Sequence, residues 1–597
     1  MELSLCRGPP PEQGKRVNIF TQQNKFVMIH RIYILFLLVI SINAAAQPAF
    51  PGAEGFGADA TGGRGGKVIY VTNLNVSGPG SLQDALDQDG PRYILFKTSG
   101  VIPGTIAVSP GHGDFTIAGQ TSPGGIVVRG FEMYNGTEPS VSNIIIRHLR
   151  SRPGDRDLHP SPFWLAEDGI TVGGVHRGII DHCSFAHARD EAVDISRSSA
   201  LTIQHCVLAE TLGDHGYLGG MLINYSDQSS RLDSLSIHHN VWNRIGGRMP
   251  EISCETPFCS GKTIKIELSD NIFWDPQIEL WYEGVTGFGS NFYLEMNAVN
   301  NLSVAANGYG NGMFHHDLLH FSQNKLYFSG NRLNLYPQLS DYQLFYCCND
   351  FPENHPNTDN GIAMLRNSRH PFPAISYTPT SELRAHAAAN AGAFPRDAMD
   401  GRLAGYLQNN QIIDLPVEAA AADDAFLLNP PAGVFADTDS DGMPDYWENT
   451  HGTNPAIQDH NGTNLSQSIT GTNGYTNLEC YLNCLSDALV NNQTTPACGI
   501  QAFTTGNADI SSGGSTVSIL QNPAGEILTV VHVPAATDGN ASLFDVNGRM
   551  VRSVTLERTG GLACLQAGEL AEGIYLLEWN HGGSRGNIRV MILRGNN

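Results

Sequence analysis

The chain has 597 residues, too many for one ordinary compact domain, so its length indicates either several domains or a repeat fold. Its 35 basic and 58 acidic residues give a net charge of −23, which argues against a nucleic-acid binder. An acidic ligand would also be repelled unless a cation stood between it and the protein, so for such a ligand a metal-bridged site is favoured.

Residues 28–46 have the pattern of a secretory signal peptide: a basic start, the apolar run IYILFLLVISI and small residues before the cut. The run is too short to span a bilayer comfortably. We interpret residues 1–27 as a doubtful N-terminal extension, with Met28 as the initiator. The alternative is a cytoplasmic extension that ends in an anchor helix. The signal predicts export.

Residues 47–429 are predicted to form a parallel β-helix. As far as about residue 350, short apolar segments alternate with turns rich in Gly, Asn and Pro, and Asn240, Asn271, Asn301 and Asn331 recur every 30 or 31 residues. One turn-forming Asn per coil suits a solenoid, because stacked amides can hydrogen-bond along the stack. Cys183 and Cys206 are expected to be stacked, buried thiols. Between about residues 360 and 428 we expect a partial cover over the end of the helix, then a linker.

Three acids in the centre of this region could share one metal ion. Asp190 and Asp194 are four residues apart and can converge from a turn and the strand after it, while Asp168 lies one coil earlier. The neighbouring Glu167 and Glu191 would point to the opposite side if the strands are regular.

Residues 430–503 contain a calcium-loop module and a linker. The segment DTDSDGMPDYWE has oxygen donors at positions 1, 3, 5, 9 and 12 of a calcium loop, with a glycine at position 6 for the sharp turn. The predicted ligands are Asp437, Asp439, Asp441, Asp445 and Glu448. No base or nucleophile is nearby, so this calcium is predicted to be structural.

The ten cysteines after the signal permit disulfides in an oxidising compartment, but their spacing does not fix the pairing. Cys254 and Cys259 could close one small loop, and Cys480 and Cys484 another.

Residues 517–597 alternate as strands of a small β-sandwich. The residues Asn522-Pro523, LFDVNGR and GIYLL resemble the C-terminal sorting domain of proteins exported by the type IX secretion system. The resemblance implies passage across an outer membrane, and a location that is either secreted or on the outer cell surface.

The segment from about Ala49 to Phe372 resembles the pectate lyases of polysaccharide lyase family one, through PAFPGAEGFGADATGG, GIIDHCSF, DEAVDI and GGRMP. That family is a right-handed parallel β-helix that cleaves polygalacturonate by calcium-dependent β-elimination. The predicted fold class is therefore all-β: this solenoid, then the calcium-loop module, then the C-terminal sandwich.

The resemblance also implies roles for single residues. Asp194 and Asp190 take the places of calcium ligands, and Asp168 stands where the first ligand is found. Arg248 matches the arginine that abstracts the proton, with Arg244 as its nearest competitor, and an arginine base predicts an alkaline optimum. Where the family often has a lysine, this chain has Asp214 and His215, and His215 could substitute in binding substrate.

β-Elimination removes the proton on C5 of a uronate and expels the oxygen on C4. A divalent cation on the uronate carboxylate offsets the charge that grows there. The expected cofactor is Ca²⁺, and the expected partners are an acidic plant polysaccharide and the secretion machinery, with the chain a monomer. Two other readings stay open: a β-helix glycoside hydrolase, which needs a raised-pKa acid and a second carboxylate, and a non-catalytic polysaccharide-binding surface protein.

Overall fold

The computed structural model describes residues 47–592, apart from 135–140, 158, 213–218, 347–350, 353–363, 413–423, 430–433, 492–516 and short gaps between 520 and 583. The predicted extension (1–27), the signal peptide (28–46) and His215 therefore lie outside the described residues. Within the described residues, no helix has the length and apolar character needed to cross a membrane.

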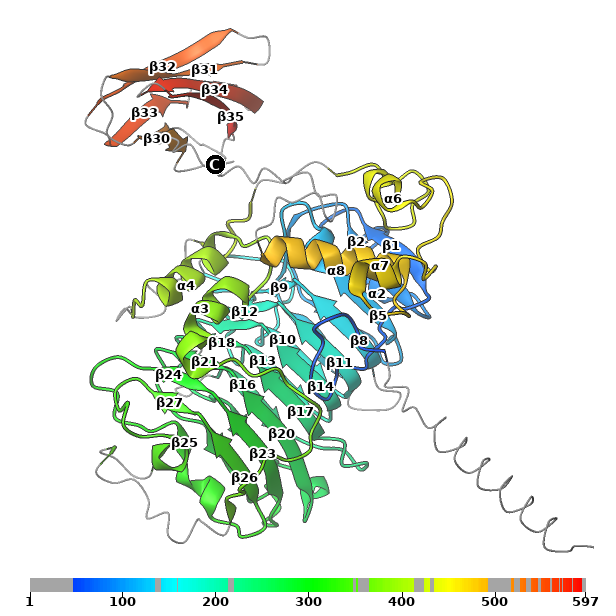
Figure 1. Ribbon diagram of the computed structural model, residues 1–597, viewed down its shortest axis with the longest axis vertical. Helices are drawn as coiled ribbons and strands as arrows, with labels where there is room; N and C mark the ends of the chain where they lie inside the picture. Colours follow the sequence, from blue (N-terminus) through cyan, green and yellow to red (C-terminus); the bar gives the residue numbers. More distant parts are fainter. Residues whose placement is uncertain are drawn as a thin grey trace, which may run out of the picture. The chain divides into compact units, whose positions relative to one another are not determined.

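The chain winds as a solenoid whose three parallel sheets enclose one core, as the sequence predicted (Figure 1). The chain runs through the ten-stranded, the nine-stranded and the seven-stranded sheet in turn, once per coil. The ten-stranded sheet contains β1 (Lys67–Val71), β2 (Arg92–Phe96), β5 (Phe115–Ala118), β8 (Val141–Arg147), β11 (Val175–Asp181), β14 (Ser199–Gln204), β17 (Asp233–His238), β20 (Thr263–Ser269), β23 (Tyr293–Val299) and β26 (Lys325–Ser329).

The other two sheets are built of shorter strands. The nine-stranded sheet contains β3 (Gly100–Ile102), β6 (Ile126–Val128), β9 (Arg150–Ser151), β12 (Ser184–Ala186), β15 (Val207–Ala209), β18 (Val241–Asn243), β21 (Ile272–Trp274), β24 (Leu302–Val304) and β27 (Arg332–Leu333). The seven-stranded sheet contains β4 (Ile106–Ala107), β7 (Phe131–Tyr134), β10 (Ile170–Gly173), β13 (Val193–Ser196), β16 (Met221–Asn224), β19 (Glu251–Ile252) and β22 (Trp281–Tyr282).

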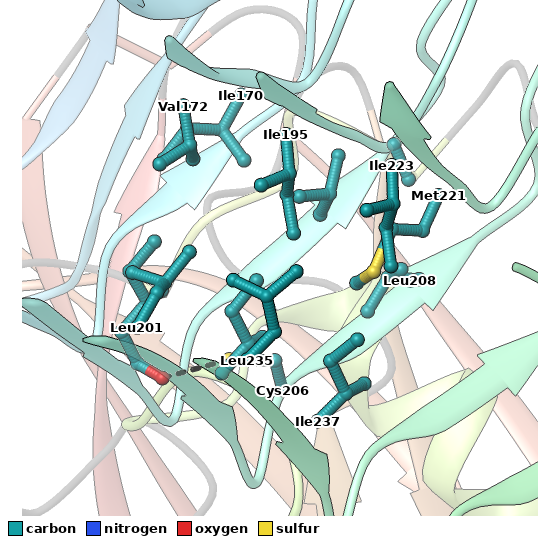
Figure 2. Packing of buried hydrophobic residues seen from close by; sticks show 14 of the residues in the cluster. Ile170, Val172, Ile195, Leu201, Cys206, Leu208, Met221, Ile223, Leu235 and Ile237 are labelled. Carbon is teal, nitrogen blue, oxygen red and sulfur yellow. Dashed lines mark hydrogen bonds between the residues drawn. The ribbon is translucent and has the colours of Figure 1, made fainter. Parts of the chain in front are cut away.

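Each coil buries apolar side chains from all three sheets. In one coil, Ile180, Phe185 and Ile195 are fully buried in the same cluster. Figure 2 shows how residues of successive coils repeat this arrangement, with Val172, Ile195 and Ile223 lined up along the stack. No coil could bury this surface alone, so stacking is what stabilises the fold.

The predicted asparagine ladder is confirmed. Asn240 Nδ2 donates to Asn271 Oδ1, Asn271 to Asn301 and Asn301 to Asn331, over 2.9–3.1 Å. In the two coils before Asn240, Cys206 and Cys183 are fully buried thiols in the same turn, also as predicted.

Helices cover the flank of the solenoid where the sequence suggested a cover over its end. α3 (Thr380–Asn390) and α4 (Ala398–Gln408) bury Leu383, Ala387 and Leu403 against Val207 and Trp274 of the nine-stranded sheet. The expectation of an end cap was wrong because that sheet presents apolar side chains outward as well as inward.

The calcium-loop module is helical and packs against the first coils. It contains α6 (Asp445–His451), α7 (Ser466–Thr470) and α8 (Asn477–Val490), and Trp447 and Leu478 bury the outer faces of Tyr93 and Leu95. Polar contacts hold α8 in place, among them an ion pair of 2.8 Å between Arg64 and Glu479. The one other α-helix of the described residues is the short α2 (Leu82–Leu86), whose N-cap is Ser81.

The C-terminal block contains two antiparallel sheets that share one apolar cluster, including Leu543, Leu577 and Val590. Its strands are β29 (Val517–Ile519), β30 (Ile527–His532), β31 (Gly539–Phe544), β32 (Met550–Leu556), β33 (Gly561–Gln566), β34 (Gly573–His581) and β35 (Ser584–Ile592).

Disulfide expectations were half right. Cys254 and Cys259 are bonded, with 6.4 Å between their Cα atoms. The second suggested pair is wrong: Cys480 is a free, buried thiol, whereas Cys484 is disulfide-bonded.

A column of buried imidazoles runs beside the ladder. His148, His182, His205 and His239 each leave the ten-stranded sheet with a positive φ of 50–57°, and their rings follow one another at centroid distances of 4.8–5.2 Å. Burial lowers the pKa of His148 and His205 well below the usual value and that of His239 to about 2.

This column predicts a measurable acid sensitivity. A buried neutral histidine binds fewer protons folded than unfolded, so its contribution to stability is complete above the unfolded pKa of about 6.5 and is lost as the pH falls. Replacing His205 with Asn should therefore reduce the loss of unfolding free energy between about pH 7.5 and pH 5.5 by about 1.4 kcal/mol. Urea unfolding at both pH values, with calcium in excess, measures this; equal losses in both proteins would contradict it.

Candidate functional site

Three of the predicted site residues lie on turns that lead from the nine-stranded to the seven-stranded sheet. Asp168 precedes β10, Asp190 precedes β13 and Arg248 precedes β19. Parallel pairing keeps successive turns one above the other, and it aligns an outward row along the sheet: Glu132, Thr171, Asp194, Leu222, Glu251 and Trp281. We call this the groove row.

Carboxylates converge beside this row. Oxygen atoms of Asp168, Asp190 and Glu191 lie within 4.8 Å of one another. Asp168 is fixed by two hydrogen bonds, accepting from Thr171 Oγ1 at 2.7 Å and from the backbone N–H of Glu191 at 3.2 Å. We call Asp168, Asp190 and Glu191 the acid group.

Asp194 lies on β13 outside this acid group but within its electric field. Burial, then the charges of Asp168 and Asp190, raise the pKa of Asp194 to about 7. Burial also raises the pKa of Asp168 to about 7, with further contributions from Asp190 and Glu167. This concentration of negative charge is the kind of environment that a divalent cation relieves.

Glu191 is the residue that sequence reasoning placed on the wrong side. The alternation argument assumed a strand, but β13 begins only at Val193, so Glu191 belongs to the turn. Its carboxylate is almost fully buried and contacts Arg248.

Arg248 contributes the positive charge next to the acid group. Its guanidinium lies 3.5 Å from Asp190 Oδ1 and 3.2 Å from Glu251 Oε2, and it also pairs with Glu191. Arg248 has a φ of 52°, and a Cβ atom on Gly219 would come within 2.6 Å of the Arg248 Cβ. Gly219 is therefore needed for this arginine to lie over the preceding coil.

Three other arginines of the solenoid are buried. Arg150 and Arg152 are fully buried in ion pairs with Asp397 and Asp400, 2.7–3.1 Å apart, so they cannot hold a substrate. Arg244, the competitor of Arg248, is also buried.

The calcium loop contains two groups of acids that share Asp441. One is Asp437, Asp439 and Asp441; the other is Asp441, Glu448 and Asp459. Asp445 joins neither group, because its carboxylate accepts hydrogen bonds from Thr438. Asp459 was missed because it lies eleven positions beyond the twelve-residue pattern. Glu448 is fully buried, its Oε2 lacks a hydrogen-bond partner among the described residues, and burial beside the other acids raises its pKa to about 8.

Comparison with known proteins gives consistent relatives. The chain is 30% identical over 465 residues to a probable pectate lyase C of Aspergillus fumigatus, which covers 75% of this chain and 97% of that protein. A probable pectate lyase C of Emericella nidulans is 29% identical over 471 residues, 76% and 96% of the two chains. Residues 518–593 match a family described as the secretion system C-terminal sorting domain.

Among solved structures, jun a 1, the major allergen from cedar pollen, is similar over 57% of this chain and 92% of that one, with 16% identity and a TM-score of 0.35. Pectate lyase C from Erwinia chrysanthemi is similar over 58% and 97%, with 14% identity and a TM-score of 0.35.

Proposed function

This chain belongs to the pectate lyase family and is a polysaccharide lyase, and from that premise we propose that it cleaves polygalacturonate-type pectin by calcium-dependent β-elimination, giving unsaturated oligogalacturonides. The observation that carries the proposal is the convergence of the acid group on Arg248 beside the groove row.

The donor set fits calcium. Calcium takes six to eight oxygen ligands with loose geometry, and the acid group offers several carboxylate oxygens with Asp194 close by. The buried carboxylates with raised pKa values are stabilised in their charged form by a cation. When bound, calcium supplies Lewis-acid stabilisation of the charge that develops on the uronate carboxylate.

Arg248 is proposed as the base that takes the C5 proton. Neighbouring carboxylates favour its protonated form, which opposes that role. Once Asp190 and Glu191 serve as metal ligands, they pair less strongly with the guanidinium, and loss of a proton from Arg248 becomes easier. Glu251, 3.2 Å away, orients the side chain toward the groove row.

The calcium loop is proposed to be structural, with Asp459 as an additional ligand. Asp441 and Glu448 are fully buried, so an ion there would compensate for charge that solvent cannot reach. We also propose export through the signal peptide and the type IX system, with residues 518–593 as the sorting domain.

The proposal is tested by following the ultraviolet absorbance of the conjugated product from polygalacturonate. We expect absorbance to rise with calcium and to stay flat after chelation, with recovery when calcium is added back. New reducing ends without absorbance would identify a hydrolase, and binding without either product would identify a non-catalytic protein.

A further inference from the structure

A further group of potential metal ligands lies beyond one end of the groove row, away from the acid group and from the acids of the calcium loop. Asp317 is surrounded by three imidazoles of one short segment, which begins in β25 (Phe314–His315) and continues as the 3-10 helix His316–Leu319. We call this the histidine cluster; its members are His315, His316, Asp317 and His320.

The distances within the cluster are regular. His316 Nε2 and His320 Nδ1 each lie 3.3 Å from Asp317 Oδ1, and His315 Nδ1 lies 3.3 Å from Oδ2. One ligand atom each from His315, His316 and Asp317 lies within 4.8 Å of the others, which is close enough for all three to bind one metal ion. His320 is a neighbouring fourth donor that contacts Asp317.

The surroundings hold these side chains in place. The ring of Trp281 stacks on that of His315 at 4.1 Å. His320 is half exposed, so an ion could enter from solvent.

The donor chemistry selects the class of metal. Imidazole nitrogens with one carboxylate suit zinc and related transition metals, whereas calcium prefers oxygen ligands alone. We propose that the histidine cluster is a binding site for a divalent transition-metal ion of the zinc class.

The position of the histidine cluster along the groove row indicates what an ion bound there would do. Leu280 bridges Phe314 in parallel, so His315 lies one rung beyond Trp281 and four rungs beyond Asp194. At about 4.8 Å per rung, the two sites are roughly 19 Å apart along one sheet face. An ion in the histidine cluster would place a second positive charge on a face that is otherwise rich in acids.

The test is zinc titration by calorimetry of the full-length protein, purified without a histidine tag and with calcium in excess to fill the oxygen sites. We expect one zinc ion to bind, and the His320→Gln and Asp317→Asn variants to bind it at least 10-fold more weakly. His320→Gln changes a half-exposed side chain and should leave the fold intact, which circular dichroism verifies. His176→Gln, an exposed histidine on the ten-stranded sheet, is the matched control and should bind as the wild type does.

Cobalt provides a second readout that does not depend on folding energy. Cobalt bound to imidazole and carboxylate ligands gives visible absorption bands, which should be present in the wild type and in His176→Gln and absent in Asp317→Asn. Wild-type protein that takes up no zinc, or variants that bind zinc as tightly as the wild type, would overturn the proposal. Neither result bears on the proposed lyase reaction, because the acid group and Arg248 are unchanged.

Discussion

Replacing Arg248 with lysine is expected to lower the turnover number on polygalacturonate about 1,000-fold, because a positioned general base contributes about 100- to 10,000-fold to a proton transfer. Lysine keeps a positive charge that Asp190, Glu191 and Glu251 can pair with, so the melting temperature should change little. Initial rates of absorbance increase at saturating calcium and substrate measure the effect.

The same variant separates a base from a simple clamp for the substrate carboxylate. Loss of a clamp would raise KM and leave most of the turnover number, since lysine also pairs with a carboxylate. Arg332→Lys, at an exposed arginine on β27, is the matched control and should retain wild-type rates. A turnover number for Arg248→Lys within 10-fold of wild type would exclude the proposed base.

Replacing Asp168 with asparagine is expected to raise the calcium concentration needed for half-maximal activity about 100-fold, because calcium affinity depends strongly on the number of charged ligands. Asparagine keeps the size of the side chain; its Oδ1 can still accept from the N–H of Glu191, and its Nδ2 can donate to Thr171 Oγ1. Excess calcium should therefore restore part of the activity. Activity measured over a calcium titration tests this.

Asp441→Asn separates the two proposed calcium sites. It removes a buried carboxylate shared by the two groups of acids in the calcium loop, so we expect calcium to raise the melting temperature of the variant less than that of the wild type. The calcium requirement for turnover should remain that of the wild type.

An unchanged calcium requirement in Asp168→Asn would exclude the acid group as the catalytic calcium site.

The periodic part of the chain was predictable, and the departures from periodicity were not. One turn residue recurs in each coil, so the ladder could be predicted from Asn240, Asn271, Asn301 and Asn331. Glu191 was misplaced because strand alternation was extended two residues too early, into a turn. Sequence alone has no signal for where a two- to four-residue strand begins.

Long-range contacts account for the other misses. Asp459 joins Glu448 only after the chain has folded back past α6, so a pattern that ends at position 12 cannot include it. The cover on the flank was not predicted because the outward apolar residues of the nine-stranded sheet, such as Val207 and Trp274, are single residues on short strands. They form a continuous stripe only after the coils stack. The histidine cluster was visible as HHDLLH, but its spacing matches no common metal motif.

The asparagine ladder has a polarity. Each amide donates once to the next side chain toward the C-terminal end of the solenoid and once to a backbone carbonyl of the preceding coil. The last of them, Asn331, donates from both Nδ2 and its backbone N–H to Asp341 Oδ1, each over 2.9 Å. Aligned amides of this kind add their dipoles, as peptide groups do in an α-helix, with the positive pole at the donor end. Asp341 puts a carboxylate at that pole, so an anion stabilises the aligned dipoles, while backbone N–H and C=O groups of the neighbouring coils fix the orientation of each amide.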